Sequence, residues 1–399
     1  MSAAAVAQRE LLRARLRALG FAVVRFAAVQ PMGDPGLRAW LAAGYHADMD
    51  WLARSADKRL DPQLVLPGAQ TAIMLGVNYW PGAAVAPGAF ARYALHADYH
   101  DTIRPGLVAA GRELEERLGI GGADYRYYVD AGPVIERGWA AASGIGFLGK
   151  NGNLISRAHG NWLLLAAILL RPAIPPDEPL TAGRTAPVGG GAGRLCGKCT
   201  RCLDACPTAA FPRPGVVDAR RCISYHTIEN RGMVPRALRS RFGARVFGCD
   251  ECLVVCPWNR FAQAGRSELL ARRYDLGTLR LLDLLQLTPE RFREVFRGTA
   301  VKRAKLTGVL RNACIAAGNV WVAGGDTAAV APSSLAVAGE RAAVVAELLR
   351  LARYELPVVR AHAVWAVFRV LGAGAAAGAL AECRTAENDP TVIDEYAAG

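Results

Sequence analysis

The fold is constrained most by the stretch Cys196-Gly-Lys-Cys199-Thr-Arg-Cys202-Leu-Asp-Ala-Cys206-Pro207. Its spacing, C-x2-C-x2-C-x3-C-P, is that of bacterial ferredoxins with two 4Fe-4S clusters. Three thiolates on one tight loop can bind one cluster, while the fourth cysteine binds the other. A four-cysteine zinc site is the alternative, but such sites are typically two C-x2-C pairs separated by a spacer. We therefore predict two adjacent 4Fe-4S clusters that transfer electrons.

A second run, Cys249-Asp-Glu-Cys252-Leu-Val-Val-Cys256-Pro257, lacks one cysteine, because the position that would complete it is Val246. Cys222 is the nearby cysteine that can replace the missing ligand. If the last cysteine of each run binds the cluster of the other run, two sets of four follow. The predicted sets are Cys196, Cys199, Cys202 and Cys256 for one cluster, and Cys206, Cys222, Cys249 and Cys252 for the other.

The remaining cysteines, Cys314 and Cys383, stand in apolar helical contexts and are predicted to be buried without chemistry. The N-terminal residues lack the apolar core of a signal peptide, so close-spaced thiols indicate metal binding rather than disulfides. The longest apolar run, residues 162–170, has half the length that crosses a bilayer. We expect no membrane contact and a cytoplasmic protein.

The chain has 399 residues, 52% hydrophobic and 21% charged, which is typical of an ordered protein with two or three domains. Its formal net charge is +13. Residues 271–311 contain ten Lys or Arg against four Asp or Glu, and residues 231–245 contain five Arg and no acid. This concentration of positive charge favours a polyanionic partner or a membrane surface.

The hydrophobic pattern predicts an α+β protein with three domains. These are an α+β domain (1–185), a two-cluster ferredoxin-like domain (186–265) and an all-α domain (266–399). In the first domain we expect helices over 11–19 and 107–118, strands over 71–79 and 162–169, and an extended Pro- and Gly-rich connection over 171–193. In the last domain we expect helices over 279–287, 306–322, 340–352 and 357–371, with Pro357 in a first turn.

Within the last domain, the pattern at 309–313 (V-L-R-N-A) recurs at 358–362 (V-V-R-A-H), 49 residues later. This distance is close to the period of helical-pair repeats once a Gly-rich insertion is allowed. From the residues alone, the electron acceptor stays undefined, because the glycines of 144–152 do not form a Walker or Rossmann fingerprint. Asp130, Arg59 and Lys150 taken singly are typical of turns and surfaces.

Seven motifs together are more specific than any one of them. In chain order they are D-K-R-L-D-P (57–62), D-Y-H (98–100), V-D-A-G-P-V-I-E-R (129–137), G-I-G-F-L-G-K-N (144–151), C-G-K-C-T-R-C-L-D-A-C-P-T (196–208), R-C-I-S-Y-H-T-I-E (221–229) and G-C-D-E-C-L-V-V-C-P (248–257). Over nearly the whole chain, this set resembles the epoxyqueuosine reductases, cobalamin-dependent iron-sulfur enzymes of the last step of queuosine synthesis in tRNA.

The resemblance implies a base-off cobalamin between the N-terminal domain and the cluster domain. The D-x-H-x-x-G motif of other cobalamin proteins is absent, because Asp98-Tyr99-His100 continues as Asp-Thr-Ile. Asp130 stands at the family's proton-donor position, and a buried carboxyl can hold its proton near neutral pH. The implied corrin contacts are Arg59, Ala91, Asp130, Leu154, Ser156, Leu165 and Ser224.

The resemblance also implies that the C-terminal helices form a HEAT-like part that binds tRNA. The residues expected to contact tRNA are Glu229, Arg297, Lys302, Arg303, Lys305 and Arg311. Basic side chains there would neutralise phosphates in a salt-sensitive, sequence-independent way. His226 departs from the family's usual apolar residue, and we expect it to serve packing. An external electron donor and a monomeric chain complete the interpretation.

Two other functions are the alternatives. A corrinoid reductive dehalogenase resembles this family in its corrin and ferredoxin parts, but a twin-arginine export signal would favour it and none is present. A non-catalytic electron-transfer or RNA-binding iron-sulfur protein would use the N-terminal domain only as structure. A cobalamin titration would separate the enzyme from the non-catalytic protein, because an EPR signal of base-off cobalt is expected only for the enzyme.

Overall fold

The computed structural model describes residues 2–30, 34, 36–82, 88–180, 191–265, 268–323 and 339–399. The chain forms two compact units. The first combines Met1–Ala84, Ala97–Arg220 and Glu251–Ala271. The second combines Val85–His96, Arg221–Asp250 and Arg272–Gly399. Each unit is therefore assembled from segments that are distant in the sequence.

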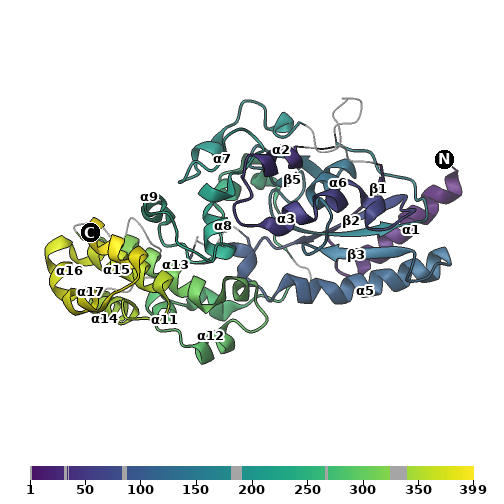
Figure 1. Ribbon diagram of the computed structural model, residues 1–399. Helices are drawn as coiled ribbons and strands as arrows, with labels where there is room; N and C mark the ends of the chain where they lie inside the picture. Colours follow the sequence, from purple (N-terminus) through teal and green to yellow (C-terminus); the bar gives the residue numbers. More distant parts are fainter. Residues whose placement is uncertain are drawn as a thin grey trace. The chain divides into compact units, whose positions relative to one another are not determined.

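The first unit is built on a four-stranded antiparallel sheet with strand order β1-β2-β6-β3 (Figure 1). Its strands are β1 (Val23–Ala28), β2 (Thr71–Asn78), β3 (Tyr125–Val129) and β6 (Leu163–Leu170). In the central pair, Thr71 lies opposite Leu170 and Asn78 opposite Leu163. The two strands expected from the apolar runs are thus confirmed to within one residue at each end.

The strand β2 is buried along its whole length. Because successive side chains of a strand point to opposite faces of the sheet, both faces must be covered at this strand. One helix, α6 (Glu136–Ala142), packs on β1, β2 and β6 and shares a hydrophobic core with them. Two long helices, α1 (Ala3–Ala18) and α5 (Tyr99–Leu118), pack together and contact β1 and β3, respectively. The helices expected over 11–19 and 107–118 are confirmed, although α1 ends at Ala18 and both helices begin earlier than expected.

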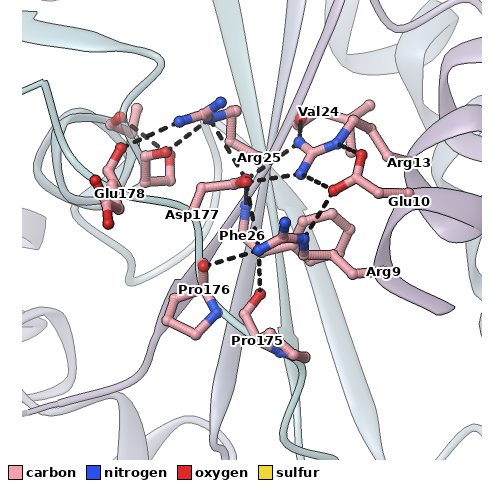
Figure 2. Close-up of polar contacts among 12 residues, drawn as sticks. Arg9, Glu10, Arg13, Val24, Arg25, Phe26, Pro175, Pro176, Asp177 and Glu178 are labelled. Carbon is pink, nitrogen blue, oxygen red and sulfur yellow. Dashed lines mark hydrogen bonds and ion pairs between the residues drawn. The ribbon is translucent and has the colours of Figure 1, made fainter. Parts of the chain in front are cut away.

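A partly buried cluster of ion pairs around Asp177 joins α1 and β1 to the segment that follows β6 (Figure 2). Arg13 Nη2 donates to Asp177 Oδ1 at 2.7 Å, and Arg25 Nε lies 3.4 Å from Oδ2. The backbone N–H of Phe26 also donates to Oδ2, at 2.9 Å. Residues 171–180 contain no helix or strand, as expected for an extended connection. Residues 181–190 of that predicted connection lie outside the described residues, and residues 191–193 contain no helix or strand.

The rest of the first unit consists of short helices, a two-stranded hairpin and the loops between them. They are α2 (Leu37–Ala42), α3 (Asp50–Arg54), α4 (Ala56–Leu60), η1 (Pro62–Leu64), the β4 (Gly146–Leu148) and β5 (Leu154–Ser156) hairpin, η3 (Arg194–Cys196), α7 (Arg201–Asp204), η4 (Ala219–Arg221), α10 (Glu251–Val254) and η6 (Pro257–Phe261). Most of them have four to six residues, so their positions depend on packing against the sheet and its helices rather than on their own helix stability.

The second unit is helical. Its elements are η2 (Arg92–Leu95), α8 (Ile223–Ile228), α9 (Arg236–Arg239), η5 (Ser240–Phe242), η7 (Tyr274–Thr278), α11 (Leu281–Leu285), α12 (Pro289–Val295), η8 (Ala300–Ala304), α13 (Lys305–Val320), α14 (Arg341–Leu351), α15 (Pro357–Leu371), α16 (Ala373–Ala379), α17 (Ala381–Ala386) and α18 (Pro390–Ala398). α13 and α15 pack on each other through largely buried surfaces. The four helices predicted for this region are confirmed, with Pro357 in the first turn of α15.

The three-domain division expected from the sequence differs from this architecture. Residues 186–265 do not form a unit of their own, because 221–250 belong with the helices and the flanking stretches with the sheet. The physical reason is that the short cysteine loops bury little apolar surface by themselves, whereas Val234, Phe242 and Phe247 lie in the helical core. The expected boundary at 185/186 touches residues outside the described ones. Among the described helices, none is both long and apolar enough to cross a bilayer.

Candidate functional site

Four cysteines of the first unit line one small cavity of about 40 Å³, together with Lys150, Asn151, Ile155, Pro257 and Trp258. The cysteines are Cys196, Cys199, Cys202 and Cys256. They come from two runs far apart in the sequence, which meet because α7 packs on α10. The structure thus brings together the four cysteines that the spacing predicts for one cluster.

The chemistry of these thiols fits a metal cluster. Burial, followed by the neighbouring Cys196 and Cys256, raises the pKa of the Cys202 thiol to about 11. Because iron binds the thiolate, metal binding would release these protons. Soft thiolates are the ligands of 4Fe-4S clusters, and the Nζ of Lys150 donates to the Gly197 carbonyl at 2.7 Å beside them.

The second predicted set of cysteines is divided between the two units. Cys206 and Cys252 belong to the first unit, where Cys206 Sγ accepts from the Ala210 N–H at 3.3 Å. Cys222 and Cys249 belong to the second unit, where Cys222 is the N-cap of α8 and Cys249 packs against the helical core. The role of Cys222 as the fourth ligand therefore stays a prediction.

Three residues that we expected to serve packing do so. Cys314 and Cys383 are buried, and burial raises the pKa of the Cys314 thiol. His226 is 3% exposed, its Nδ1 lies 3.0 Å from the Asn230 amide nitrogen, and its ring contacts Phe242. The packing prediction for these three side chains is confirmed.

Asp130 follows β3 directly and has a left-handed backbone with a φ of 55°. Aspartate is one of the few residue types that tolerate this conformation, which recurs at functional sites. The hydroxyl of Tyr99 donates to its Oδ2. Its side chain is nevertheless 65% exposed. The expectation that Asp130 is a buried carboxyl is therefore wrong for this structure.

The Asp98-Tyr99-His100 motif lies at the N-terminus of α5, beside Asp130. Asp98 caps this helix: its Oδ1 accepts from the His100 N–H at 3.1 Å and lies 2.8 Å from the His100 Nδ1. On the other side of the ring, His100 Nε2 lies 3.8 Å from Asp130 Oδ2. The Tyr99 ring stacks on His100 with centroids 4.1 Å apart. The sequence motif alone does not predict a role for Asp98, Tyr99 or His100.

The electrostatic surroundings of His100 favour its charged form. The hydrogen bond to Asp98 is the largest influence and raises the His100 pKa, while burial acts in the opposite direction. The carboxylates of Asp98, Asp130 and Asp101 raise it further. The signal in the sequence was an aspartate two residues before a histidine at a helix start.

Arg59, in α4, contacts the loop that carries Asp130. Its Nη1 donates to the Val134 carbonyl at 3.2 Å, and its Nε donates to Ser55 Oγ at 2.9 Å. Burial lowers the Arg59 pKa, against the opposing charges of Glu136 and Asp130. Arg59 therefore fixes the 130–135 loop through the Val134 carbonyl, a role that is independent of any bound cofactor.

Glu136 is a functional candidate that sequence reasoning missed. It is the first residue of α6, and its Oε1 is buried without a hydrogen-bond partner among the residues that the structure describes. Burial raises the Glu136 pKa to about 7; the Asp130 charge acts in the same direction, while Arg59 and Arg137 oppose it. The available signal was an acid directly after the apolar pair Val-Ile in the 129–137 motif.

The residues predicted to contact a corrin differ in their accessibility. Leu154 and Ser156 in β5, and Ala91 in the second unit, are 7%, 3% and 5% exposed. Arg59, Leu165 and Ser224 are half-buried and present some surface. The described residues therefore fit a bound corrin in part, and the individual contacts stay predictions.

Four of the basic residues predicted to contact tRNA are exposed in the second unit: Arg297, Lys302, Arg303 and Lys305. Arg303 forms an ion pair with Glu229 at 2.7 Å. Lys302 and Arg303 lie in η8, and Lys305 begins α13 with a left-handed φ of 62°. The turn between η8 and α13 thus presents several cationic side chains to solvent.

Arg311 is different, and its predicted contact with tRNA is wrong. It is 1% exposed. Its Nη1 donates to the carbonyls of Asn230 and Gly232 at 2.9 and 2.8 Å, and its Nη2 donates to the His226 carbonyl. Burial lowers the Arg311 pKa to about 10. The guanidinium stabilises the loop after α8 instead of facing solvent.

Two known protein families each match a part of this chain. The family described as "4Fe-4S double cluster binding domain" matches residues 195–259, which contain all eight predicted ligands. The family described as "Epoxyqueuosine reductase QueG, DUF1730" matches residues 59–131, which extend from Arg59 to just beyond Asp130.

Relatives and solved structures extend the match to most of the chain. An epoxyqueuosine reductase of Vibrio cholerae is 38% identical over 294 residues, covering 72% of this chain and 76% of the relative. One of Pseudomonas aeruginosa is 35% identical over 364 residues, covering 88% and 92%. A crystal structure of epoxyqueuosine reductase with a tRNA-Tyr epoxyqueuosine-modified stem loop superimposes with a TM-score of 0.81 at 26% identity, covering 98% of both chains.

Proposed function

The chain belongs to the epoxyqueuosine reductase family, and we propose that it reduces epoxyqueuosine to queuosine at the wobble position of tRNA, the last step of queuosine biosynthesis. The observation that carries this proposal is the match over 98% of both chains to a reductase solved with its modified stem loop. The cavity lined by four cysteines supports it, because the reaction needs a supply of electrons.

The overall reaction sets what the protein must provide. Removal of the epoxide oxygen breaks two C–O bonds, forms a C=C bond, consumes two electrons and two protons, and releases one water. We propose that an external donor supplies the electrons through two 4Fe-4S clusters held by the predicted cysteine sets. When bound, base-off cobalamin supplies a strong reductant at the epoxide carbon. Arg59, Leu165 and Ser224 are the proposed corrin contacts with accessible surface.

Proton supply is the task of the protein side chains. A departing alkoxide is a poor leaving group near neutral pH, so an acid must protonate the oxygen. We propose that Asp130 delivers the proton, since it is exposed on a loop that Arg59 fixes through the Val134 carbonyl.

The helical unit is proposed to bind tRNA as a HEAT-like repeat structure. The recurring sequence pattern lies in α13 and α15, which pack on each other. Its two arginines act alike: Arg311 donates to the carbonyls of one loop, and Arg360 Nη1 donates to the carbonyls of Tyr354 and Glu355, both at 3.0 Å. The exposed basic residues before and at the start of α13 would neutralise phosphates.

The proposal is tested by anaerobic incubation of the cluster-reconstituted protein with cobalamin, a reductant and tRNA that carries epoxyqueuosine. Mass analysis of the nucleosides should show queuosine, and omission of cobalamin should abolish it. An EPR signal of base-off cobalt should appear when the protein binds cobalamin. A protein that binds cobalamin but leaves epoxyqueuosine unchanged would contradict the proposal and favour the dehalogenase alternative. A protein without cobalamin binding would favour the electron-transfer alternative.

The proposed role of Asp130 has its own test. Asp130→Asn should retain clusters and cobalamin while turnover falls by about 10²-fold or more, the usual contribution of a general acid. Single-turnover rates and the cobalt EPR signal measure both effects. Asp394→Asn, the same change at an exposed aspartate of the helical unit, is the matched control. A rate for Asp130→Asn equal to that of the control would remove Asp130 from this role.

A further inference from the structure

The reaction needs two protons, and the structure raises the question of where they are stored. Asp130 delivers them in the proposed function, yet its side chain is 65% exposed. One carboxyl group carries one proton at a time, so the second transfer needs a neighbouring group that returns a proton to it. A neighbouring group that keeps a proton at neutral pH would resolve this difficulty, provided that it can reach the Asp130 carboxylate.

The group that meets this requirement is on the first turn of α5. His100 Nε2 lies 3.8 Å from Asp130 Oδ2, on the same carboxylate oxygen that accepts from Tyr99. The opposite ring nitrogen, Nδ1, lies 2.8 Å from Asp98 Oδ1. Because that aspartate also caps the helix through the His100 N–H, the ring is fixed with Nε2 toward Asp130. A carboxylate, an imidazole and a second carboxylate thus lie in sequence.

We propose that His100, oriented by Asp98, stores the protons that Asp130 passes to the departing oxygen. The inference rests on the proposed function and deepens it. Each of the two protons moves from His100 Nε2 to Asp130 Oδ2, and from Asp130 to the oxygen as a C–O bond breaks. The side chain of His100 is 39% exposed, so water reprotonates it between the two transfers. The two electrons come from the cluster-fed reductant, and the oxygen leaves as water.

The alternative role of His100 is structural, as part of a helix cap. A positive imidazolium is unfavourable at a helix N-terminus, where the dipole prefers negative charge. The position is therefore an unsuitable place for a cation unless nearby carboxylates offset the dipole. Asp98 and Asp101 on this element, and Asp130 from the loop after β3, supply those charges and raise the His100 pKa. Beyond them, Arg59 and Glu136 face Asp130.

The first test measures the proton on His100 directly. The cluster-containing protein, labelled with ¹⁵N in its histidine side chains, is titrated by NMR without substrate. The His100 pKa should lie above the ordinary value of 6.5, and Asp98→Asn should lower it. His46→Gln is the matched control, because His46 Nε2 lies 3.9 Å from Asp50 in another ion pair of the same unit. This variant should leave the His100 pKa unchanged. A His100 pKa that is the same in the parent protein and in Asp98→Asn would overturn the proposal.

The second test uses the pH dependence of the reaction. Single-turnover rates at saturating tRNA should fall as pH rises through the His100 pKa, and Asp98→Asn should move this fall to lower pH. His100→Gln should be at least about 10-fold slower at pH 7 and should lack the fall, since its amide cannot store a proton. His46→Gln should match the parent protein. A parent-like rate and pH profile in His100→Gln would overturn the proposal.

Two controls separate this inference from other failures. Thermal unfolding and cluster absorbance show whether His100→Gln is folded; if it is not, Asp98→Asn, which retains the histidine, decides through its pH profile. If the parent protein forms no queuosine, the proposed function fails. In that case the NMR titration alone decides whether Asp98 maintains a proton on His100, and an unchanged pKa in Asp98→Asn refutes the inference.

Discussion

At the scale of single residues, Glu136 shows how burial changes one carboxyl. Its raised pKa, about 7 against an ordinary 4.5, means that the folded protein binds this proton more tightly than the unfolded chain. The stabilisation is fully present below pH 4.5 and is lost as pH rises through 7. Above that pH an ionised carboxylate stays buried with one oxygen unpaired.

Glu136→Gln should remove this pH dependence. The Tm of the variant relative to the parent protein should rise between pH 6 and pH 8.5, by an amount corresponding to about 1 kcal/mol. Glu116→Gln, at a side chain that is 69% exposed, should show no such trend. Differential scanning at both pH values measures it, and parallel Tm curves for all three proteins would show that Glu136 is ionised in the folded state throughout.

Cys222 is the residue whose role depends most on sequence logic, since the second cysteine run lacks its first ligand at Val246. Cys222→Ala should lower the iron content of the reconstituted protein below the expected value of about eight per chain, and should change the EPR spectrum of the reduced clusters. Cys314→Ala, at a buried cysteine of α13, should retain both properties. Parent-like iron content in Cys222→Ala would assign the fourth ligand elsewhere.

At the scale of elements, basic side chains have two different roles between η8 and α13. Arg311 is buried and stabilises the fold, whereas Lys302 is exposed and is proposed to bind tRNA. Arg311→Met should lower Tm by at least about 5 °C, because three loop carbonyls lose their donors. Lys302→Ala should leave Tm within about 1 °C, but should weaken tRNA binding and reduce the salt slope of the binding constant by about one. If Arg311→Met changed only tRNA binding, Arg311 would have to be exposed when the protein is in solution.

Elements could be predicted wherever their hydrophobic period was long and regular. The strands β2 and β6 and the helices α13 and α15 were predicted within about two residues. The direction of one side chain is harder to predict, because Arg311 stands in a basic stretch yet points into the core. In that helix residues 308–320 are all buried, so charge alone could not separate exposed from buried arginines. The same limit applies to Asp130, whose exposure is set by the turn after β3.

At the scale of the whole molecule, the chain passes between its two units several times. Residues 85–96 and 221–250 belong to the helical unit although the chain around them belongs to the sheet unit. Cysteine spacing predicts which residues bind iron, but it carries no information about which core each loop joins. The family and the grouping of Cys196, Cys199, Cys202 and Cys256 could therefore be predicted from the sequence, whereas the division of the ferredoxin-like region could not.

The proposed conversion of epoxyqueuosine to queuosine can be measured most directly by mass analysis of tRNA nucleosides. The tRNA is taken from a bacterial host that lacks its own epoxyqueuosine reductase and expresses this chain in the presence of cobalamin. Queuosine should appear when the parent protein is expressed, and epoxyqueuosine should accumulate when Asp130→Asn is expressed. Epoxyqueuosine alone, in cells where the parent protein is soluble and contains its clusters and cobalamin, would contradict the proposed function.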